Sequence, residues 1–296
     1  MKKIVISIGL CLVGFVSMAQ NVDEVNNAAY VSKRGVYLLP QAGDFAIGID
    51  VDPFLTYLGS FFSNYGNTAP DLSSQTIYGK YFLDDNRAVR AKLMLGLFNA
   101  VNKGFVLDNA AFVSNPATDR TVVDIERTSG SEVLLQAGYE FRRGNGRVQG
   151  FYGGEIVLGY GGGKVKYDYG NRMTAEVKAP LTYDFYSSSS PQASDYRPTE
   201  IKLGKTFLAG LGAFAGVEYF FAPQLSLGCE LGLGFVFENT GQNKATIEEW
   251  NYVADRREVN STKNQSGDSW SNYGTNARNL GGGTYTTANL FLLFHF

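Results

Sequence analysis

The sequence is poor in the residues from which most enzyme sites are built. It has one histidine, His295, and two cysteines, Cys11 and Cys229, among 296 residues. Histidine is the side chain that most often transfers protons near neutral pH, and together with cysteine it supplies most zinc ligands. We therefore expect no enzymatic activity, no metal site and no cofactor.

A long hydrophobic run occurs only near the N-terminus, at residues 4–16. The run follows Lys2 and Lys3 and precedes the small-residue site Ser17-Met18-Ala19. This order predicts a secretory signal peptide over residues 1–19, because the run is too short to span a membrane. Removal of the peptide would leave a single cysteine, so we expect no disulfide bond within the chain.

An excess of charge of either sign is also missing. The 26 basic and 28 acidic residues give a net charge of −2, so we expect no nucleic-acid partner. Glycine, tyrosine and phenylalanine are abundant instead, at 35, 18 and 21 residues. This composition is typical of a transmembrane β-barrel, in which contacts with lipid are spread over alternate residues.

Apolar residues recur with a period of two in eight stretches of the chain. In residues 88–98, for example, Leu93 and Leu95 alternate with Arg90 and Lys92. A strand places alternate side chains on opposite faces, so each stretch predicts a strand with one apolar face. The eight predicted strands cover residues 44–52, 75–83, 88–98, 132–142, 148–160, 206–221, 225–236 and 283–296.

The connections between these strands alternate between long and short. The short ones are 84–86, 143–147 and 222–224, and the long ones are 53–74, 100–130, 161–202 and 239–282. Short periplasmic turns and long extracellular loops are the pattern of outer-membrane barrels. The sequence therefore predicts an all-β fold, a transmembrane antiparallel up-and-down β-barrel of eight strands. It would occupy residues 43–296 after a periplasmic lead-in at 20–42, with both termini periplasmic.

Two alternatives to this fold stay open. The first has ten strands, because residues 121–126 and 164–169 also alternate, although we interpret them as strand extensions above the membrane. The second is a soluble barrel, whose interior would have to be filled with leucine and phenylalanine. The position of the aromatic residues favours the membrane barrel, because they gather at the periplasmic ends of the apolar stripes, as in an interfacial girdle. They are Phe45, Tyr81, Tyr139, Phe141, Tyr219, Phe221, Phe294 and Phe296.

The face opposite the apolar stripes carries charged residues of both signs. Eight strands enclose an interior just wide enough for side chains, where charges must be paired. We interpret the set as a salt-bridged plug, with a gated narrow pore as the alternative, since inward glycines leave room for water pockets. The candidate lumen network is Asp50, Lys80, Arg90, Lys92, Glu140, Glu155, Glu218 and Glu230.

The other candidate residues carry weaker signals. His295 falls at the periplasmic end of the last strand, away from the outer rim where barrel enzymes act, and Cys229 falls on the lipid-facing stripe. Trp250 and Trp270 in the last loop are candidate contact residues, or they pack the loops against one another. The loop carboxylates could bind Ca²⁺, but we interpret them as solvated charges; they are Glu248, Glu249, Asp255 and Glu258.

Short segments resemble outer-membrane β-barrel proteins common in Bacteroidetes. They are Leu39-Pro40-Gln41-Ala42-Gly43-Asp44-Phe45-Ala46-Ile47-Gly48-Ile49-Asp50 and Gly79-Lys80-Tyr81-Phe82-Leu83-Asp84-Asp85-Asn86. The terminal Phe296 resembles the assembly signal of such barrels, which implies the barrel assembly machinery as a partner. The architecture is similar to small barrels of the OmpA and OmpX type, without the peptidoglycan-binding domain of OmpA-type proteins. The resemblance implies a fold and a compartment, with no catalytic residues.

These observations favour a structural or surface-interaction role in the outer membrane. The expected partners are outer-membrane lipid and either a larger membrane complex, of which the chain is a subunit, or a surface ligand. A narrow passive pore for small solutes is the alternative function.

Overall fold

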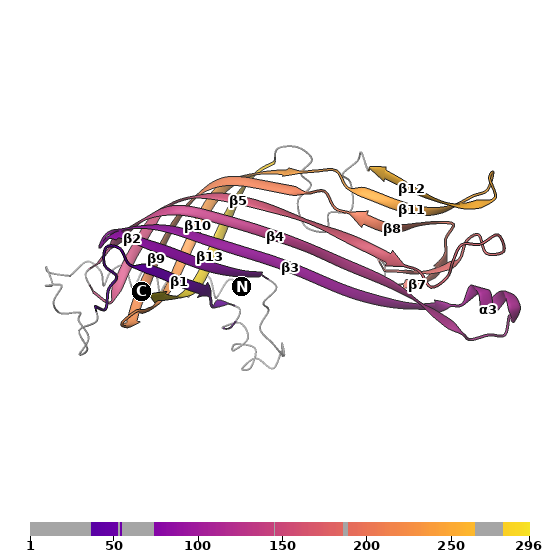
Figure 1. Cartoon of the computed structure of the whole chain (residues 1–296), viewed down its shortest axis with the longest axis horizontal. Coiled ribbons are helices and arrows are strands. Elements are labelled where there is room, and N and C mark those ends of the chain that lie inside the picture. Colours follow the sequence, from indigo (N-terminus) through magenta and orange to yellow (C-terminus); the bar gives the residue numbers. More distant parts are fainter. Residues whose placement is uncertain (1–36, 53, 55–73, 145, 186–188, 264–280) are drawn as a thin grey trace.

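Eight strands close into an antiparallel ring in the computed structural model, which describes residues 37–52, 54, 74–144, 146–185, 189–263 and 281–296 (Figure 1). Consecutive strands pair around the ring, and β1 and β13 close it with Ala46 opposite His295. The predicted eight-stranded barrel is therefore confirmed. The strands are β1 (Phe45–Asp50), β2 (Ser74–Asp84), β3 (Arg87–Leu107), β4 (Thr121–Arg143), β5 (Val148–Asp168), β9 (Thr206–Ala222), β10 (Leu225–Thr240) and β13 (Gly281–His295).

The ring turns its aliphatic stripes outward. Leu211 and Leu233, on neighbouring strands, are 68% and 64% exposed. Phe291 and Leu293, on the inner face of β13, are fully buried. The inside holds aromatic rings and charged groups rather than a core of leucine alone. This distribution is the reverse of the one a soluble barrel needs, and it follows from the period-two pattern of each strand.

The three tight turns lie at one end of the ring. They join β2 to β3, β4 to β5 and β9 to β10. β1 begins and β13 ends at this same end, where the Phe296 backbone N–H donates to the carbonyl of Phe45 at 2.8 Å. We call it the turn end.

At the opposite end, β3, β4 and β5 continue well beyond the ring (Figure 1). They pair with strands built from the long connections, in the order β3-β4-β5-β8-β11-β12, and we call this six-stranded sheet, with the helix at its tip, the projection. No helix in the described ranges is long and apolar enough to cross a membrane. The additional elements are α3 (Asn109–Ser114), β6 (Leu181–Asp184), β7 (Ser189–Ala193), β8 (Tyr196–Lys202), β11 (Lys244–Asn251) and β12 (Arg256–Lys263).

The projection corrects the prediction that residues 100–130, 161–202 and 239–282 are loops. Much of each stretch is strand, which the sequence hides because polar residues occupy both faces. The interpretation of 121–126 and 164–169 as strand extensions is confirmed, since they belong to β4 and, as far as Asp168, to β5. The run Gly161-Gly162-Gly163, which begins the predicted connection 161–202, lies inside β5.

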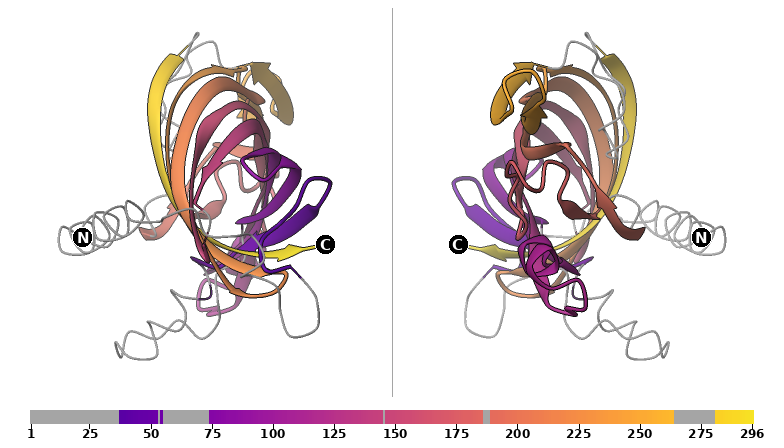
Figure 2. Two further views of the ribbon diagram at one scale, coloured as in Figure 1. Left: turned by 90° about the vertical axis from the view of Figure 1, so that its left-hand side faces the viewer. Right: turned by 90° about the vertical axis from the view of Figure 1, so that its right-hand side faces the viewer.

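Inward-facing glycines make room for aromatic rings. A Cβ atom built on Gly216 would stand 2.3 Å from the ring of Phe151, and one on Gly228 would stand 2.3 Å from the ring of Phe291. Both rings are buried in the barrel. At these positions the space that suggested water pockets is therefore filled by phenylalanine. Figure 2 shows the barrel along two further directions.

Gly153 and Gly154 provide a matched test of this packing, because they are neighbours on opposite faces of β5. A Cβ on Gly153 would stand 2.0 Å from the Tyr139 carbonyl oxygen and 2.6 Å from Phe214, whereas one on Gly154 meets its first atom at 3.6 Å. We expect Gly153→Ala to destabilise the barrel by about 1–3 kcal/mol and Gly154→Ala to change little. Urea unfolding followed by circular dichroism measures both, and equal midpoints would contradict the packing described.

Candidate functional site

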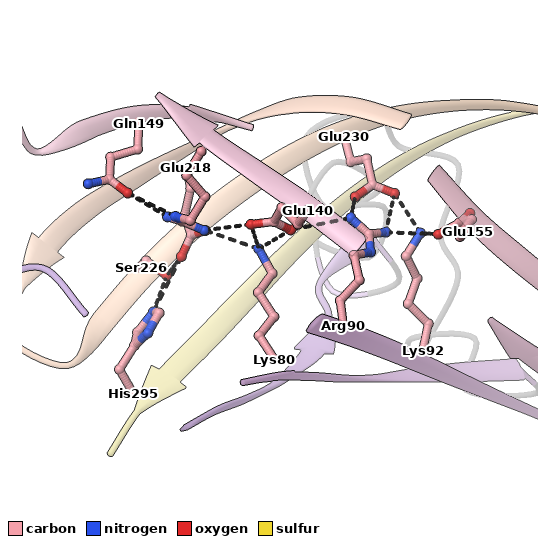
Figure 3. Close-up of polar contacts among 11 residues, drawn as sticks. Lys80, Arg90, Lys92, Glu140, Gln149, Glu155, Glu218, Ser226, Glu230 and His295 are labelled. Carbon is pink, nitrogen blue, oxygen red and sulfur yellow. Dashed lines mark hydrogen bonds and ion pairs between the residues drawn. The ribbon is translucent and has the colours of Figure 1, made fainter. Parts of the chain in front are cut away.

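Six neighbouring strands of the ring each place charged side chains on its inner face. β2 gives Lys80, β3 gives Arg90 and Lys92, and β4 gives Glu140 and Arg142. β5, β9 and β10 each add one glutamate. We call the set the charge network; its members are at most 6% exposed (Figure 3), and they are Lys80, Arg90, Lys92, Glu140, Arg142, Glu155, Glu218 and Glu230.

The half of the network nearer the projection centres on Glu230. Arg90 donates to both of its carboxylate oxygens, at 2.5 and 2.9 Å, and Lys92 Nζ lies 2.5 Å from Oε1. Glu155 Oε2 accepts from Arg90 Nη2 at 3.2 Å. β3 and β10 are four strands apart in either direction around the ring, so the Arg90–Glu230 pair joins opposite walls.

The half nearer the turn end is built from two cations and two carboxylates. Lys80 Nζ lies 3.0 Å from Glu140 and 3.2 Å from Glu218. Arg142 Nη1 donates to the same two carboxylates at 2.7 and 2.9 Å. Arg90 Nη1 is 3.6 Å from Glu140 and so links the two halves.

Four cations and four carboxylates make the network electrically neutral when all are ionised. Breaking one buried pair leaves an uncompensated charge in a low-dielectric space, so removal of a single member is costly. The same balance means that the network offers no net charge to attract an ion through the ring.

Aromatic rings fill the space that the ion pairs leave. The guanidinium carbon of Arg90 lies 3.5 Å from the centre of the Phe214 ring, and Lys80 Nζ lies 4.5 Å from that of Phe151. Arg142 stands over Phe82 at 5.1 Å. A cation over the face of a ring is stabilised electrostatically, most strongly where water is absent. Each of these cations thus has carboxylates and a ring as neighbours.

Uncharged partners and His295 continue the polar contacts at the turn end. Gln149 Oε1 accepts from Arg142 Nε and Nη2 at 3.0 and 2.7 Å. Ser226 Oγ donates to Glu218 Oε1 at 2.5 Å and lies 2.8 Å from His295 Nε2. Because the Ser226 hydroxyl donates its hydrogen to Glu218, its oxygen accepts from His295, and Nε2 of His295 is the protonated nitrogen in this arrangement.

Ser226, His295 and Glu218 do not form a nucleophilic triad. In a triad the serine and the carboxylate contact different nitrogens of the imidazole. Here both approach Nε2, with Glu218 Oε1 at 3.3 Å, and Nδ1 has no hydrogen-bond partner among the described residues. Ser226 is also fully buried. Within the described ranges, no group of three or more His, Cys, Asp or Glu side chains is arranged to hold a metal ion.

The structure brings together seven of the eight residues proposed from sequence for the lumen network. Asp50 lies on the same inner face but apart from the others, half-buried, with Oδ1 accepting from the backbone N–H of Asp52 at 2.9 Å. It makes no ion pair with a described residue. Sequence reasoning left out Arg142, Gln149 and Ser226. Arg142 has the same parity along β4 as Glu140, and that parity could have identified it.

A small cavity of about 80 Å³ lies beside the network, on its projection side. Its walls include Thr76, Tyr78, Lys92, Gln136 and Asn289. The Tyr78 hydroxyl is buried there without a hydrogen-bond partner among the described residues. The cavity is large enough for a few water molecules. It ends at the network.

The loop residues singled out by sequence pack within the projection. Trp250 is 7% exposed, its backbone N–H donates to Asp195, and Lys178 Nζ lies 5.6 Å from its ring. Of the two interpretations left open for Trp250, contact residue or packing between loops, its burial supports packing. Trp270 and residues 1–36 lie outside the described residues.

Three of the four loop carboxylates considered as calcium ligands, Glu248, Asp255 and Glu258, have cationic partners, and Glu249 accepts a hydrogen bond from Asn260. Glu248 lies 3.2 Å from Arg197 and 3.0 Å from Arg257. Lys178 lies 2.6 Å from Asp255, and their hydrogen bond lowers the pKa of that carboxyl. Cys229 is half-exposed on the outer stripe of β10, and Phe296 is exposed at the turn end; its role as an assembly signal stays a prediction.

Comparison with known proteins yields only distant structural likeness. No protein-family model matches the chain, and no curated protein matches it in sequence. One similar structure is the outer membrane protein OprG from Pseudomonas aeruginosa, with 11% identity, a TM-score of 0.34 and coverage of 88% of this chain and 98% of that one. Another is a major outer membrane protein from Thermus thermophilus, with 12% identity, a TM-score of 0.36 and coverage of 86% and 100%. Likeness this distant supports no functional argument. Any statement about function has to rest on the chain's own residues.

Replacement of Arg142 tests the cost of opening the network. Arg142→Leu leaves Glu140 and Glu218 with Lys80 as their principal cation, and we expect a loss of about 3–5 kcal/mol in the free energy of unfolding. Arg87→Leu is the matched control, because Arg87 pairs with Asp84 at the surface, where solvent screens the pair and its loss should change stability little. Urea unfolding measures the free energy of unfolding of both variants. Similar losses would show that the buried ion pairs do not stabilise the barrel more than a surface pair does.

Proposed function

We propose that this chain is an outer-membrane β-barrel with a sealed interior, and that it holds a rigid sheet at the cell surface for interaction with other surface molecules. The observation that carries the proposal is the belt of exposed apolar side chains around the ring. We further propose that the turn end faces the periplasm and the projection faces outward. The short segments that resemble Bacteroidetes barrels are consistent with this compartment.

The belt has the height of a membrane. At the turn end it is bordered by exposed aromatic residues such as Phe45 and Tyr81, whose ring centres are 4.8 Å apart. At the other end it is bordered by Tyr160, Phe207 and Phe235. From Leu225 to Phe235 the strand rises roughly 33 Å, or about 25 Å along the axis at a tilt near 40°. A band of that height flanked by aromatic girdles matches the apolar face of a membrane barrel.

The network supports a structural role over a pore. Its ion pairs reach across the ring, and phenylalanine rings occupy the remaining space. A narrow passive pore remains the second candidate, favoured by the polar cavity beside Lys92. Discrete conductance steps from the purified protein in a planar lipid bilayer would support the pore and count against the plug.

The projection is ordered by internal hydrogen bonds. The fully buried Asp124 accepts from the backbone N–H groups of Gly170 and Tyr183, both at 2.8 Å. Asn171 Nδ2 donates to the carbonyls of Leu107 and Leu181 at 2.8 and 3.0 Å. These contacts tie the connection after β5 to β3 and β4. A sheet fixed in this way can present side chains in a constant geometry, as a binding surface requires.

Exposed apolar residues continue along the outer face of the projection. Val101 and Phe105 of β3 and Phe112 and Val113 of α3 are all exposed, with Phe105 at 63%. β2 begins at Ser74, which pairs with Gly96 of β3. From Leu97 onward, no described strand pairs with this edge of β3. Apolar groups beyond the membrane belt have no lipid to cover them, which favours contact with another molecule.

An arginine scan of two exposed apolar sites tests the membrane belt. Leu231→Arg introduces a charge at the middle of the belt, and we expect a cost of about 2–4 kcal/mol and reduced insertion into the outer membrane. Phe105→Arg changes an exposed apolar site on the projection, 63% exposed against 43% for Leu231, and should insert normally. The yield of folded protein in isolated outer membranes measures both. Normal insertion of the Leu231→Arg protein would contradict the proposed membrane position.

Purification in mild detergent from the native membrane tests the interaction role. We expect the wild-type protein to arrive in a stoichiometric complex, because its projection carries uncovered apolar groups. The variant Val101→Ser, Phe105→Ser should insert but lose that complex, as judged by native size and mass spectrometry. Recovery of the wild type as a monomer alone would count against the interaction role and leave a structural one.

A further inference from the structure

Lysines line up where the projection joins the barrel. Lys164 of β5 is opposite Lys202 of β8, and Lys202 is opposite Lys244 of β11. Directly opposed residues in antiparallel strands point to the same face, so the three exposed side chains form one row about 10 Å long, two strand spacings. The exposed Lys166 and Lys205 flank it. We call these five residues the lysine row.

Backbone contacts fix the position of the row. The Leu203 N–H donates to the Gly163 carbonyl, and the Gly241 N–H donates to the Lys205 carbonyl, both at 2.9 Å. Lys205 Nζ lies 5.7 Å from the ring of Tyr160, a residue of the outer aromatic border. β5 runs from Tyr160 to Lys166 in unbroken register with β4, so the side chains of Lys164 and Lys166 leave the sheet on the same face as Tyr160. The row therefore lies directly beyond the apolar belt, on its lipid-facing side.

The row has little internal compensation for its charge. Glu200 lies 3.1 Å from Lys202 and 3.8 Å from Lys166, whereas the other three lysines make no ion pair with a described residue. Burial tends to raise the pKa of Glu200, but its hydrogen bond to Lys202 and the nearby lysine charges outweigh burial and lower that pKa. The field at the row is therefore positive.

Like charges placed opposite each other weaken strand pairing, so the arrangement calls for a reason. Lysines often protect open sheet edges from aggregation. That explanation does not apply here, because β5, β8 and β11 each have a strand on both sides. An anion from outside the chain would relieve the repulsion.

We propose that the lysine row binds the phosphate groups of anionic lipid headgroups in the outer leaflet. The proposal rests on the proposed function, because the row meets headgroups only if the belt lies in a membrane. Lysine binds phosphate as a point charge, and its long stem lets the ammonium follow a mobile headgroup. A row of this length suits a headgroup that carries more than one phosphate. Basic residues at the membrane surface attract anionic lipid in the same way.

The test compares three proteins purified in mild detergent. They are the wild type, the row variant Lys164→Gln, Lys202→Gln, Lys244→Gln, and a control with the same loss of charge on the projection, Arg120→Gln, Arg172→Gln, Arg256→Gln. Each is incubated with diphosphoryl lipid A or with phosphatidylcholine, and bound lipid per protein is counted by native mass spectrometry. We expect the wild type and the control to retain the diphosphorylated lipid, and the row variant to retain about tenfold less. Phosphatidylcholine binding should not differ among the three.

Two outcomes would overturn the inference. The first is equal retention of diphosphoryl lipid A by the row variant and the control. The second is complete displacement of the lipid by inorganic pyrophosphate at equal phosphate concentration, which would define a site for free phosphate rather than for lipid. Insertion of the proteins into the outer membrane separates this result from the proposed function. If all three insert, only the lipid site is in question, whereas failure of the wild type to insert would reject the membrane position itself.

Discussion

The rest of the structure depends on one constraint, that every charge inside the ring needs a partner of opposite sign, and the ion pair between Arg90 and Glu230 is the clearest example. Eight strands enclose a space in which a charge has no water to solvate it, so each charge needs a partner on another wall. Arg90 on β3 meets Glu230 on β10 across the full width of the ring, and Lys80 on β2 meets Glu218 on β9 in the same way. These ion pairs therefore connect opposite walls of the ring, and the charges are neutralised only when the sheet is closed.

Packing inside the ring follows from this constraint. A network of cations needs neighbours that are large and tolerate charge, and phenylalanine faces meet both needs. The rings in turn need space, which Gly216 and Gly228 provide because they have no side chain. Outside, the same strands carry apolar side chains at almost every second position, since the charged groups of the network are confined to the inner face. The charged interior and the apolar belt thus have a common origin in strand alternation.

The two ends of the barrel differ because their connections differ. At the turn end the strands are joined by short connections, and Phe45 pairs with Phe296 through backbone hydrogen bonds. At the other end β3, β4 and β5 continue into the projection, where Asp124 and Asn171 replace the charge network as the organising polar groups. The lysine row lies between these regions. Its lysines have little carboxylate compensation among the described residues, which is why we assign the row an external partner.

The sequence by itself determined the ring of eight strands, the face that each strand turns inward and seven members of the charge network, because parity along a strand is a local property. It missed the projection, where polar residues on both faces hide the period of two. It also left open whether Trp250 is a contact residue or packs between loops, and the structure buries it. Only the tertiary structure decided which charge meets which. Arg90 and Glu230 are 140 positions apart, and their contact depends on strand order and register around the closed ring, which no local pattern encodes.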